Sequence, residues 1–197
     1  MLGVLMRWLD PRTPLRPPGA VAEDEFIRRC IKCNKCAQVC PHESIVMGHL
    51  DAGASFGTPM VIPRDVPCYL CMECPPVCPT GALDPTLTEM EDVRMGVAVI
   101  DESKCLPYAG VICRACFQHC PIYREAITLR DEMYPEVHPD ACVGCGVCEF
   151  FCPAEEPAIT VQGCENRGEG GTARHRGEGR GDRSGDGRGR RQTGGEP

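Results

Sequence analysis

Cysteine is the residue whose number and spacing in this chain most directly predict chemistry. Seventeen of the 197 residues are cysteine, and sixteen of them form four groups of four, each followed at once by a proline. Three groups read C-x2-C-x2-C-x3-C-P, and the third group has seven residues in its first spacer. The groups are Cys30, Cys33, Cys36 and Cys40; Cys68, Cys71, Cys74 and Cys78; Cys105, Cys113, Cys116 and Cys120; and Cys142, Cys145, Cys148 and Cys152.

This spacing is typical of iron–sulfur clusters. Thiolates at positions i, i+3 and i+6 let one short loop wrap a face of an iron–sulfur cube, while the fourth cysteine and its proline direct the chain to a neighbouring cube. Structural zinc sites instead use separated C-x2-C pairs, and cysteines so close together in one tight loop rarely reach disulfide geometry. We therefore expect the sixteen cysteines to ligate four [4Fe–4S] clusters, with Cys164 left as a free thiol.

Short apolar runs beside the cysteine groups predict the elements that position them. Such runs follow the groups at 44–47, 81–83, 126–129 and 158–161, and others precede the second to fourth groups at 60–62, 96–100 and 136–138. Their β-branched content indicates strands of small hairpins. The stretches 37–39 and 149–151 are long enough for one helical turn.

Two further helices are expected. One starts near Ala22 with three acids in its first turn. The other is capped by Asp84 and runs to Asp92.

Each unit then reads strand, cluster loop, helical turn, strand, which predicts an α+β fold of tandem bacterial-type (2[4Fe–4S]) ferredoxin-like modules. The chain divides into six segments on this basis. They are an extended N-terminal arm (1–20), four ferredoxin-type repeats (21–53, 58–90, 95–131 and 133–164) and a Gly/Arg-rich tail expected to be disordered (165–197).

Charge and hydropathy exclude several classes of function. Residues 1–164 contain 13 Lys and Arg against 22 Asp and Glu, a net charge of −9 that argues against nucleic acid and favours a partner with a basic docking face. The sequence has no run of 18 apolar residues and so predicts no membrane span. It also has no nucleotide-binding glycine loop and no Ser–His–Asp pattern, so we expect electron transfer without independent catalysis.

Several stretches resemble the NapG/MauM family of ferredoxin-type proteins. They are LRPPGA (15–20), FIRRCIKCNKCAQVCP (26–41), GTPMVIPRDVPC (57–68), CPTGAL (78–83), RMGVAVID (94–101), CRACFQHCP (113–121), HPDACVGCGVCEFFCP (138–153) and PAITV (157–161). The resemblance implies a four-cluster protein of anaerobic respiration or methylamine oxidation. Such a protein takes electrons from a membrane quinol-oxidising iron–sulfur partner and passes them to a cytochrome or reductase. It also implies a periplasmic location. This sequence shows no twin-arginine export leader, so either the arm is the remnant of a leader or the location is cytoplasmic.

Two alternative functions and two cluster pairings stay open. The first alternative to a relay is the iron–sulfur subunit of a cytoplasmic molybdenum oxidoreductase or hydrogenase-type complex. The second is a structural or assembly protein whose clusters only replace a core.

Cluster pairs form either sequentially (groups one with two, three with four) or in a nested way (one with four, two with three). We favour the nested pairing, which the resemblance to subunits of molybdenum oxidoreductases suggests and which places Cys152 with Cys30, Cys33 and Cys36.

Overall fold

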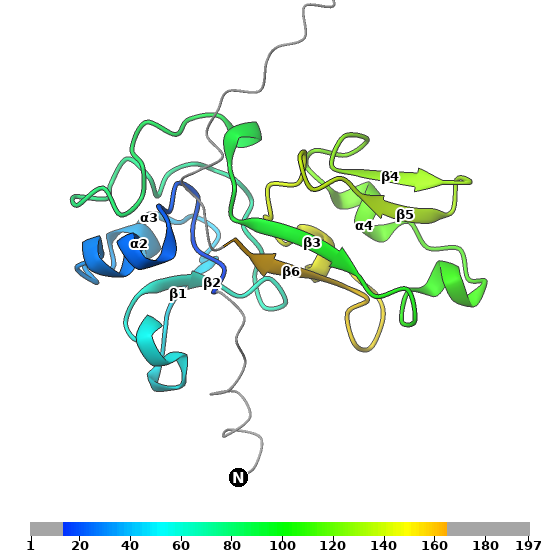
Figure 1. The fold of residues 1–197 in the computed structure, drawn as a ribbon, viewed down its shortest axis with the longest axis horizontal. Helices are drawn as coiled ribbons and strands as arrows, with labels where there is room; N and C mark the ends of the chain where they lie inside the picture. The colour runs from blue at the N-terminus through cyan, green and yellow to red at the C-terminus, as the bar shows by residue number, and fades with distance from the viewer. Residues whose placement is uncertain (1–13, 165–197) are drawn as a thin grey trace, which may run out of the picture.

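The computed structural model describes residues 14–164, while the start of the arm (1–13) and the Gly/Arg-rich tail (165–197) lie outside the described residues (Figure 1). Short helices, including 3-10 helices labelled η, and small antiparallel strands make up a mixed fold. In chain order they are α2 (Glu23–Arg29), α3 (Lys35–Val39), β1 (Ile45–Met47), η1 (Leu50–Ser55), β2 (Pro59–Val61), η2 (Met90–Asp92), β3 (Gly96–Ile100), η3 (Leu106–Ala109), α4 (Ala115–His119), β4 (Ile127–Arg130), β5 (Tyr134–Val137), α5 (Val147–Phe150) and β6 (Ile159–Gly163).

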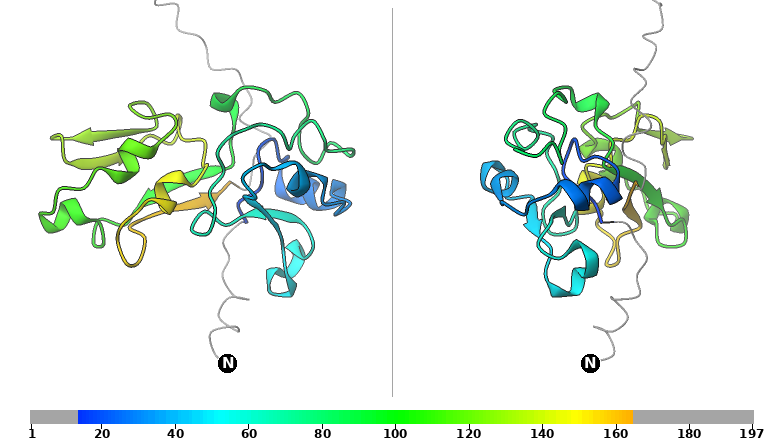
Figure 2. Two further views of the ribbon diagram at one scale, coloured as in Figure 1. Left: turned by 180° about the vertical axis from the view of Figure 1, so that it is seen from behind. Right: turned by 60° about the vertical axis from the view of Figure 1, so that its left-hand side comes forward.

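Strand pairing divides the described chain into two similar halves. In the second half, β4 and β5 form an inner hairpin, and β3 pairs antiparallel with the distant β6, placing Ile100 opposite Ile159. In the first half, β1 and β2 form the inner pair, and an isolated bridge joins Ala20 to Leu83 as the outer contact. Figures 1 and 2 show β3 and β6 lying between the first half and the β4–β5 hairpin. Each half is thus closed by a contact between its first and last segments.

Most of the elements expected from the sequence are present. The strands form at or within a few residues of the predicted runs, except that 81–83 contributes only the bridge at Leu83. The one-turn helices α3 and α5 follow the prediction, and α2 carries the three expected acids in its first turn. Runs of β-branched residues beside tight loops were therefore a sound guide to the local structure.

The helix expected from Asp84 to Asp92 is wrong. The Asp84 carboxylate accepts hydrogen bonds from the backbone N–H and the hydroxyl of Thr86, at 2.9 and 2.7 Å, while the Asp84 N–H donates to the Gly19 carbonyl at 2.7 Å. A side chain that satisfies the backbone two residues ahead competes with helix formation and favours a turn. Only the 3-10 turn η2 forms near the end of this stretch.

A buried arginine fixes the N-terminal arm to the first half. Arg16 has no exposed surface, and its guanidinium donates to Thr58 Oγ1 at 2.7 Å and to Ser55 Oγ at 2.9 Å. It also forms an ion pair with Glu23 of α2 and lies 4.6 Å from the centroid of the Phe26 ring. Because all these groups surround one buried cation, arm, hairpin and helix are held as a unit.

Candidate iron–sulfur sites

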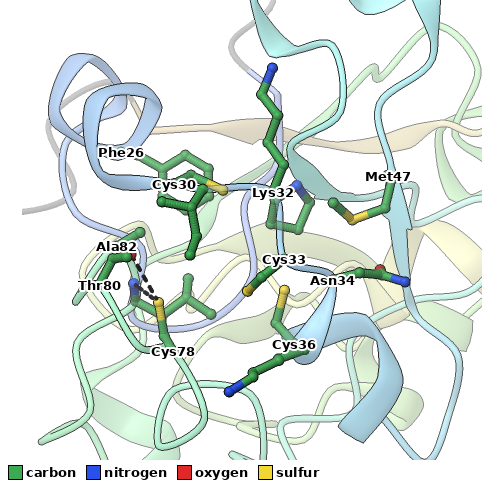
Figure 3. A pocket seen from close by; sticks show the side chains of 14 residues that line it. Phe26, Cys30, Lys32, Cys33, Asn34, Cys36, Met47, Cys78, Thr80 and Ala82 are labelled. Atoms are coloured by element: carbon green, nitrogen blue, oxygen red, sulfur yellow. Dashed lines mark hydrogen bonds between the residues drawn. The ribbon is translucent and has the colours of Figure 1, made fainter.

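Four cavities are each lined by four cysteines, and together they use all sixteen grouped cysteines once. In Figure 3 the four sulfurs of cavity I surround one space. The sets are Cys30, Cys33, Cys36 and Cys78 (cavity I); Cys40, Cys68, Cys71 and Cys74 (cavity II); Cys105, Cys113, Cys116 and Cys152 (cavity III); and Cys120, Cys142, Cys145 and Cys148 (cavity IV).

The nested pairing is therefore wrong, because Cys152 lines cavity III and Cys78 completes cavity I. The outer contact of each half explains why the fourth cysteine of each group lines the other cavity of its own half. The bridge between Ala20 and Leu83 brings the end of the second group back beside the first. In the second half, the Asp101 N–H donates to the Ala158 carbonyl at 2.7 Å at the end of the β3–β6 pair. The fourth cysteine thus crosses over within its own half.

The three compact cysteine loops share an unusual backbone. In each loop the residue before the second cysteine and the residue after it have a positive φ angle. A positive φ is uncommon outside glycine and costs roughly 1–3 kcal/mol where it is enforced. Alternating backbone of this kind turns successive N–H groups to one side, where they form an anion-binding concavity. The residues are Lys32 (57°) and Asn34 (63°), Leu70 (57°) and Met72 (60°), and Gly144 (72°) and Gly146 (84°).

Backbone amides also reach the fourth cysteines directly. The Leu83 N–H donates to Cys78 Sγ at 3.4 Å, and the Ala158 N–H donates to Cys152 Sγ at 3.3 Å. These two bonds occupy equivalent places in the two halves. Although burial raises the pKa of the Cys78 thiol, hydrogen bonds from Leu83, Thr80 and Ala82 outweigh it and lower that pKa overall. Such donors stabilise a thiolate, which is the form that binds metal.

Most of the other cavity thiols are shifted the opposite way. Burial raises the pKa of Cys36 to about 11 and the pKa values of Cys68, Cys116 and Cys145 to about 12. Burial, followed by neighbouring thiols, also raises the pKa of Cys148. Thiols in this environment stay protonated at neutral pH unless a cation replaces the protons, so metal binding here must release protons.

The donor set fits a multi-iron cluster rather than a single ion. Among residues 14–164, no group of three or more His, Cys, Asp or Glu side chains is arranged to hold one metal ion. A single tetrahedral zinc draws its thiolates to about 2.3 Å, whereas here the four cysteines of each set line a shared cavity and no three of them are placed to hold one ion. All-cysteine donors around a shared space are the ligand set of [4Fe–4S] clusters.

The four cavities lie in the order I, II, IV, III. Cys36 of cavity I is close enough to Cys74 of cavity II to raise its pKa, after burial and the Cys68 thiol. The Cys68 N–H of cavity II donates to the Cys145 carbonyl of cavity IV at 2.9 Å. Cys116 of cavity III in turn contributes to the raised pKa of Cys148 of cavity IV. Each of these three links joins one cavity to the next along this line.

The middle of the line lies at the junction of the two halves. A Cβ atom on Gly146 would lie 2.5 Å from Pro63 Cβ, so the two backbones meet where only glycine fits. The Arg64 guanidinium donates to the carbonyls of Glu149 and Cys152, both at 3.2 Å. These contacts and the Cys68–Cys145 hydrogen bond hold cavities II and IV side by side.

Comparison with known proteins agrees with these sites. Residues 29–82 match the family described as "4Fe-4S dicluster domain", and residues 135–155 match the "4Fe-4S binding domain". The ferredoxin-type protein NapG of Escherichia coli (strain K12) is 44% identical over 160 residues, covering 75% of this chain and 69% of that protein. The methylamine utilization ferredoxin-type protein MauM of Methylorubrum extorquens is 41% identical over 157 residues (75% and 71%), and that of Paracoccus denitrificans is 39% identical over 187 residues (89% and 83%).

The chain belongs to the NapG/MauM family of ferredoxin-type proteins. It is accordingly a ferredoxin-type iron–sulfur protein of electron transfer, with [4Fe–4S] domains in both halves. The dicluster match spans all eight cysteines of cavities I and II, as expected when groups one and two pair. No helix in residues 14–164 is both long and apolar enough to cross a membrane.

In this NapG/MauM-family chain, several residues that line the cavities were not among the predicted site residues. Lys32 and Lys35 line cavity I. His42 lines cavity II with Tyr69, the two ring centroids 4.6 Å apart. Their positions next to grouped cysteines in the sequence were the signal that could have identified them as cavity residues. Cys164 lines none of the four cysteine cavities and stands half-buried just after β6.

Proposed function

We propose that the sixteen grouped cysteines hold four [4Fe–4S] clusters, one in each cavity, and that the protein relays electrons in the order I, II, IV, III. The observation that supports this most is the line of four all-cysteine cavities, each beside the next, with nearest neighbours joined through Cys36–Cys74, Cys68–Cys145 and Cys148–Cys116. A bound [4Fe–4S] cluster supplies reversible electron uptake. The four ferredoxin-type repeats bounded above each contribute one cysteine group.

The protein's own residues set the conditions for that relay. Thiolates hold the iron, and the amide-rich loops stabilise negative charge on the sulfurs. Burial of Cys68, Cys74, Cys142, Cys145 and Cys148 keeps the two middle cavities away from water. The terminal cavities I and III have no fully buried cysteine. Electrons thus enter and leave at the two ends, and the middle serves as an insulated passage.

Family membership supports the choice of partners. We propose that a membrane quinol-oxidising iron–sulfur protein donates electrons, that a cytochrome or reductase accepts them, and that the exchange takes place in the periplasm. The proposal needs no nucleic acid and no catalytic residue in this chain. A purely structural role for the clusters predicts instead that the folded protein undergoes no reversible reduction.

Iron counting tests the number of clusters. Protein purified anaerobically should contain about sixteen iron and sixteen sulfide per chain, four of each per cube. Cys148→Ser should lower the iron content by up to one cluster, whereas the matched control Cys164→Ser should leave it unchanged. A wild-type content near eight iron would overturn the four-cluster proposal, and a loaded protein that cannot be reduced reversibly would overturn the relay.

A further inference from the structure

Exposed cations flank the first cysteine loop at cavity I, although residues 1–164 as a whole are acidic. Arg28, Lys32 and Lys35 are exposed, and none of them makes an ion pair with another residue of the described chain. Arg29 also lies here, but it pairs with Glu25 at 2.5 Å. The three unpaired cations follow one another within eight residues, around the first cysteine loop.

Apolar side chains lie among these cations. Ile31 is 62% exposed, and Phe56 is 48% exposed with the Lys32 ammonium 5.5 Å from its ring centroid. Cys33, between Lys32 and Lys35 in sequence, is the one exposed cysteine of the seventeen. Figure 3 shows Cys33 and Lys32 at the same cavity. Exposed apolar groups mixed with charges, directly over a redox site, are what a small transient electron-transfer interface requires.

The opposite end of the line has a different charge pattern. At cavity III, Ile112 is 78% exposed, but the nearby Lys104 is neutralised by Glu156 at 2.6 Å and Asp101 at 3.8 Å. Glu102 is exposed beside them. Around cavity III the exposed acids Asp101, Glu102, Glu155 and Glu156 outnumber the exposed cations Lys104 and Arg114, so the two ends of the relay differ in local charge, which lets each select a different partner.

We propose that the basic docking face, formed by Arg28, Ile31, Lys32, Cys33 and Lys35 with Phe56 at its edge, binds a redox protein that presents carboxylates around its own cofactor. This inference rests on the proposed four-cluster relay and names the partner chemistry at one end of it. One electron leaves one cofactor and enters the other, so the donor is oxidised and the acceptor reduced by one electron, with no bond or proton exchanged. The acidic composition of residues 1–164 by itself favours a partner with a basic face. At this end of the relay the exposed cations favour an acidic partner instead.

Oxidation by two small complexes of opposite charge tests the inference on the intact holoprotein. The protein, reduced anaerobically with dithionite and desalted, is mixed in a stopped-flow instrument with hexacyanoferrate(III), an anion, or with hexaamminecobalt(III), a cation. The variant Arg28→Glu/Lys32→Glu/Lys35→Glu reverses the charge of the face. The control Arg124→Glu/Arg130→Glu, just before β4 and at its end, is compared with the double face variant Lys32→Glu/Lys35→Glu, which makes the same change in net charge.

At low ionic strength the face variant should slow oxidation by the anion about tenfold or more and speed oxidation by the cation, since charged patches steer association by such factors. The control variant should change both rates much less, and salt should remove most of the difference. Iron content and visible spectrum establish that each variant is loaded. Should the triple Glu variant fail to load, the corresponding Gln variant gives a smaller shift of the same sign.

Equal effects of the face and control variants on the anion rate would overturn the docking inference while leaving the relay intact. Failure of either complex to oxidise the reduced wild type would instead count against the relay itself. The two proposals thus fail by different results.

Discussion

Replacing Gly146 with alanine should loosen the junction that joins the two halves. Gly146 has φ +84°, and an added Cβ would lie 2.5 and 2.7 Å from Pro63 Cβ and Cγ. Gly110 is a matched control, because its φ is +81° and an added Cβ would meet nothing within 4 Å. Both substitutions carry the left-handed cost of about 1–2 kcal/mol. Only Gly146→Ala adds an overpacking cost of roughly 1–3 kcal/mol.

Thermal unfolding of the loaded protein, followed anaerobically by circular dichroism and visible absorbance at one scan rate, measures the difference. For a chain of this size 1 kcal/mol corresponds to about 2–4 °C, so Gly146→Ala should unfold roughly 2–12 °C below Gly110→Ala. The double variant Gly146→Ala/Pro63→Gly should recover part of that gap, since the clash is then removed. Equal unfolding temperatures for the two alanine variants would refute the idea that the Pro63 contact holds the halves together.

Three further predictions follow from the buried contacts and the cavities. Arg16→Met should lower the free energy of unfolding in urea by roughly 3–5 kcal/mol, because it breaks a buried ion pair and removes the donor to the buried Thr58 and Ser55 hydroxyls; an unchanged midpoint would contradict the anchoring role. Cys152→Ser should alter the paramagnetic resonance signal of cavity III and spare that of cavity I, and Cys78→Ser should do the reverse; altered cavity I signals in the first variant would restore the nested pairing. Removal of iron by a chelator should abolish most of the circular dichroism, which reconstitution should recover, because few large apolar side chains form the core; a folded apoprotein would refute this.

Local structure was predictable from the sequence where residue type and spacing act over a few residues. The cysteine groups, the β-branched runs beside them and the acids of α2 each determine their own surroundings. The helix expected after Asp84 does not form, for one local and one long-range reason. Its capping side chain bonds to Thr86, and its N–H is taken by Gly19, a partner from 65 residues earlier in the chain that no local pattern reveals.

The long-range arrangement of the chain was less predictable from the sequence. The spacing of the cysteine groups is compatible with either pairing, and the β3–β6 pair that decides the second half joins residues about 60 apart. Arg16 was equally hidden, because arginine is rarely fully buried and its partners come from three separate segments. Positive φ at Lys32 and Leu70 contradicts their residue type, so only the demands of the site explain it.

Closure of each half by its own first and last segments also orders events during synthesis. The cysteine sets of cavities I and II are complete once Cys78 has been made, and the bridge to Leu83 follows five residues later. Cavity III must wait for Cys152, and the β6 strand that closes its half comes later still. Iron can therefore be inserted into the first half while the second is still emerging from the ribosome. A nested arrangement would instead have left the first three cysteines without their fourth ligand until nearly the whole chain was made.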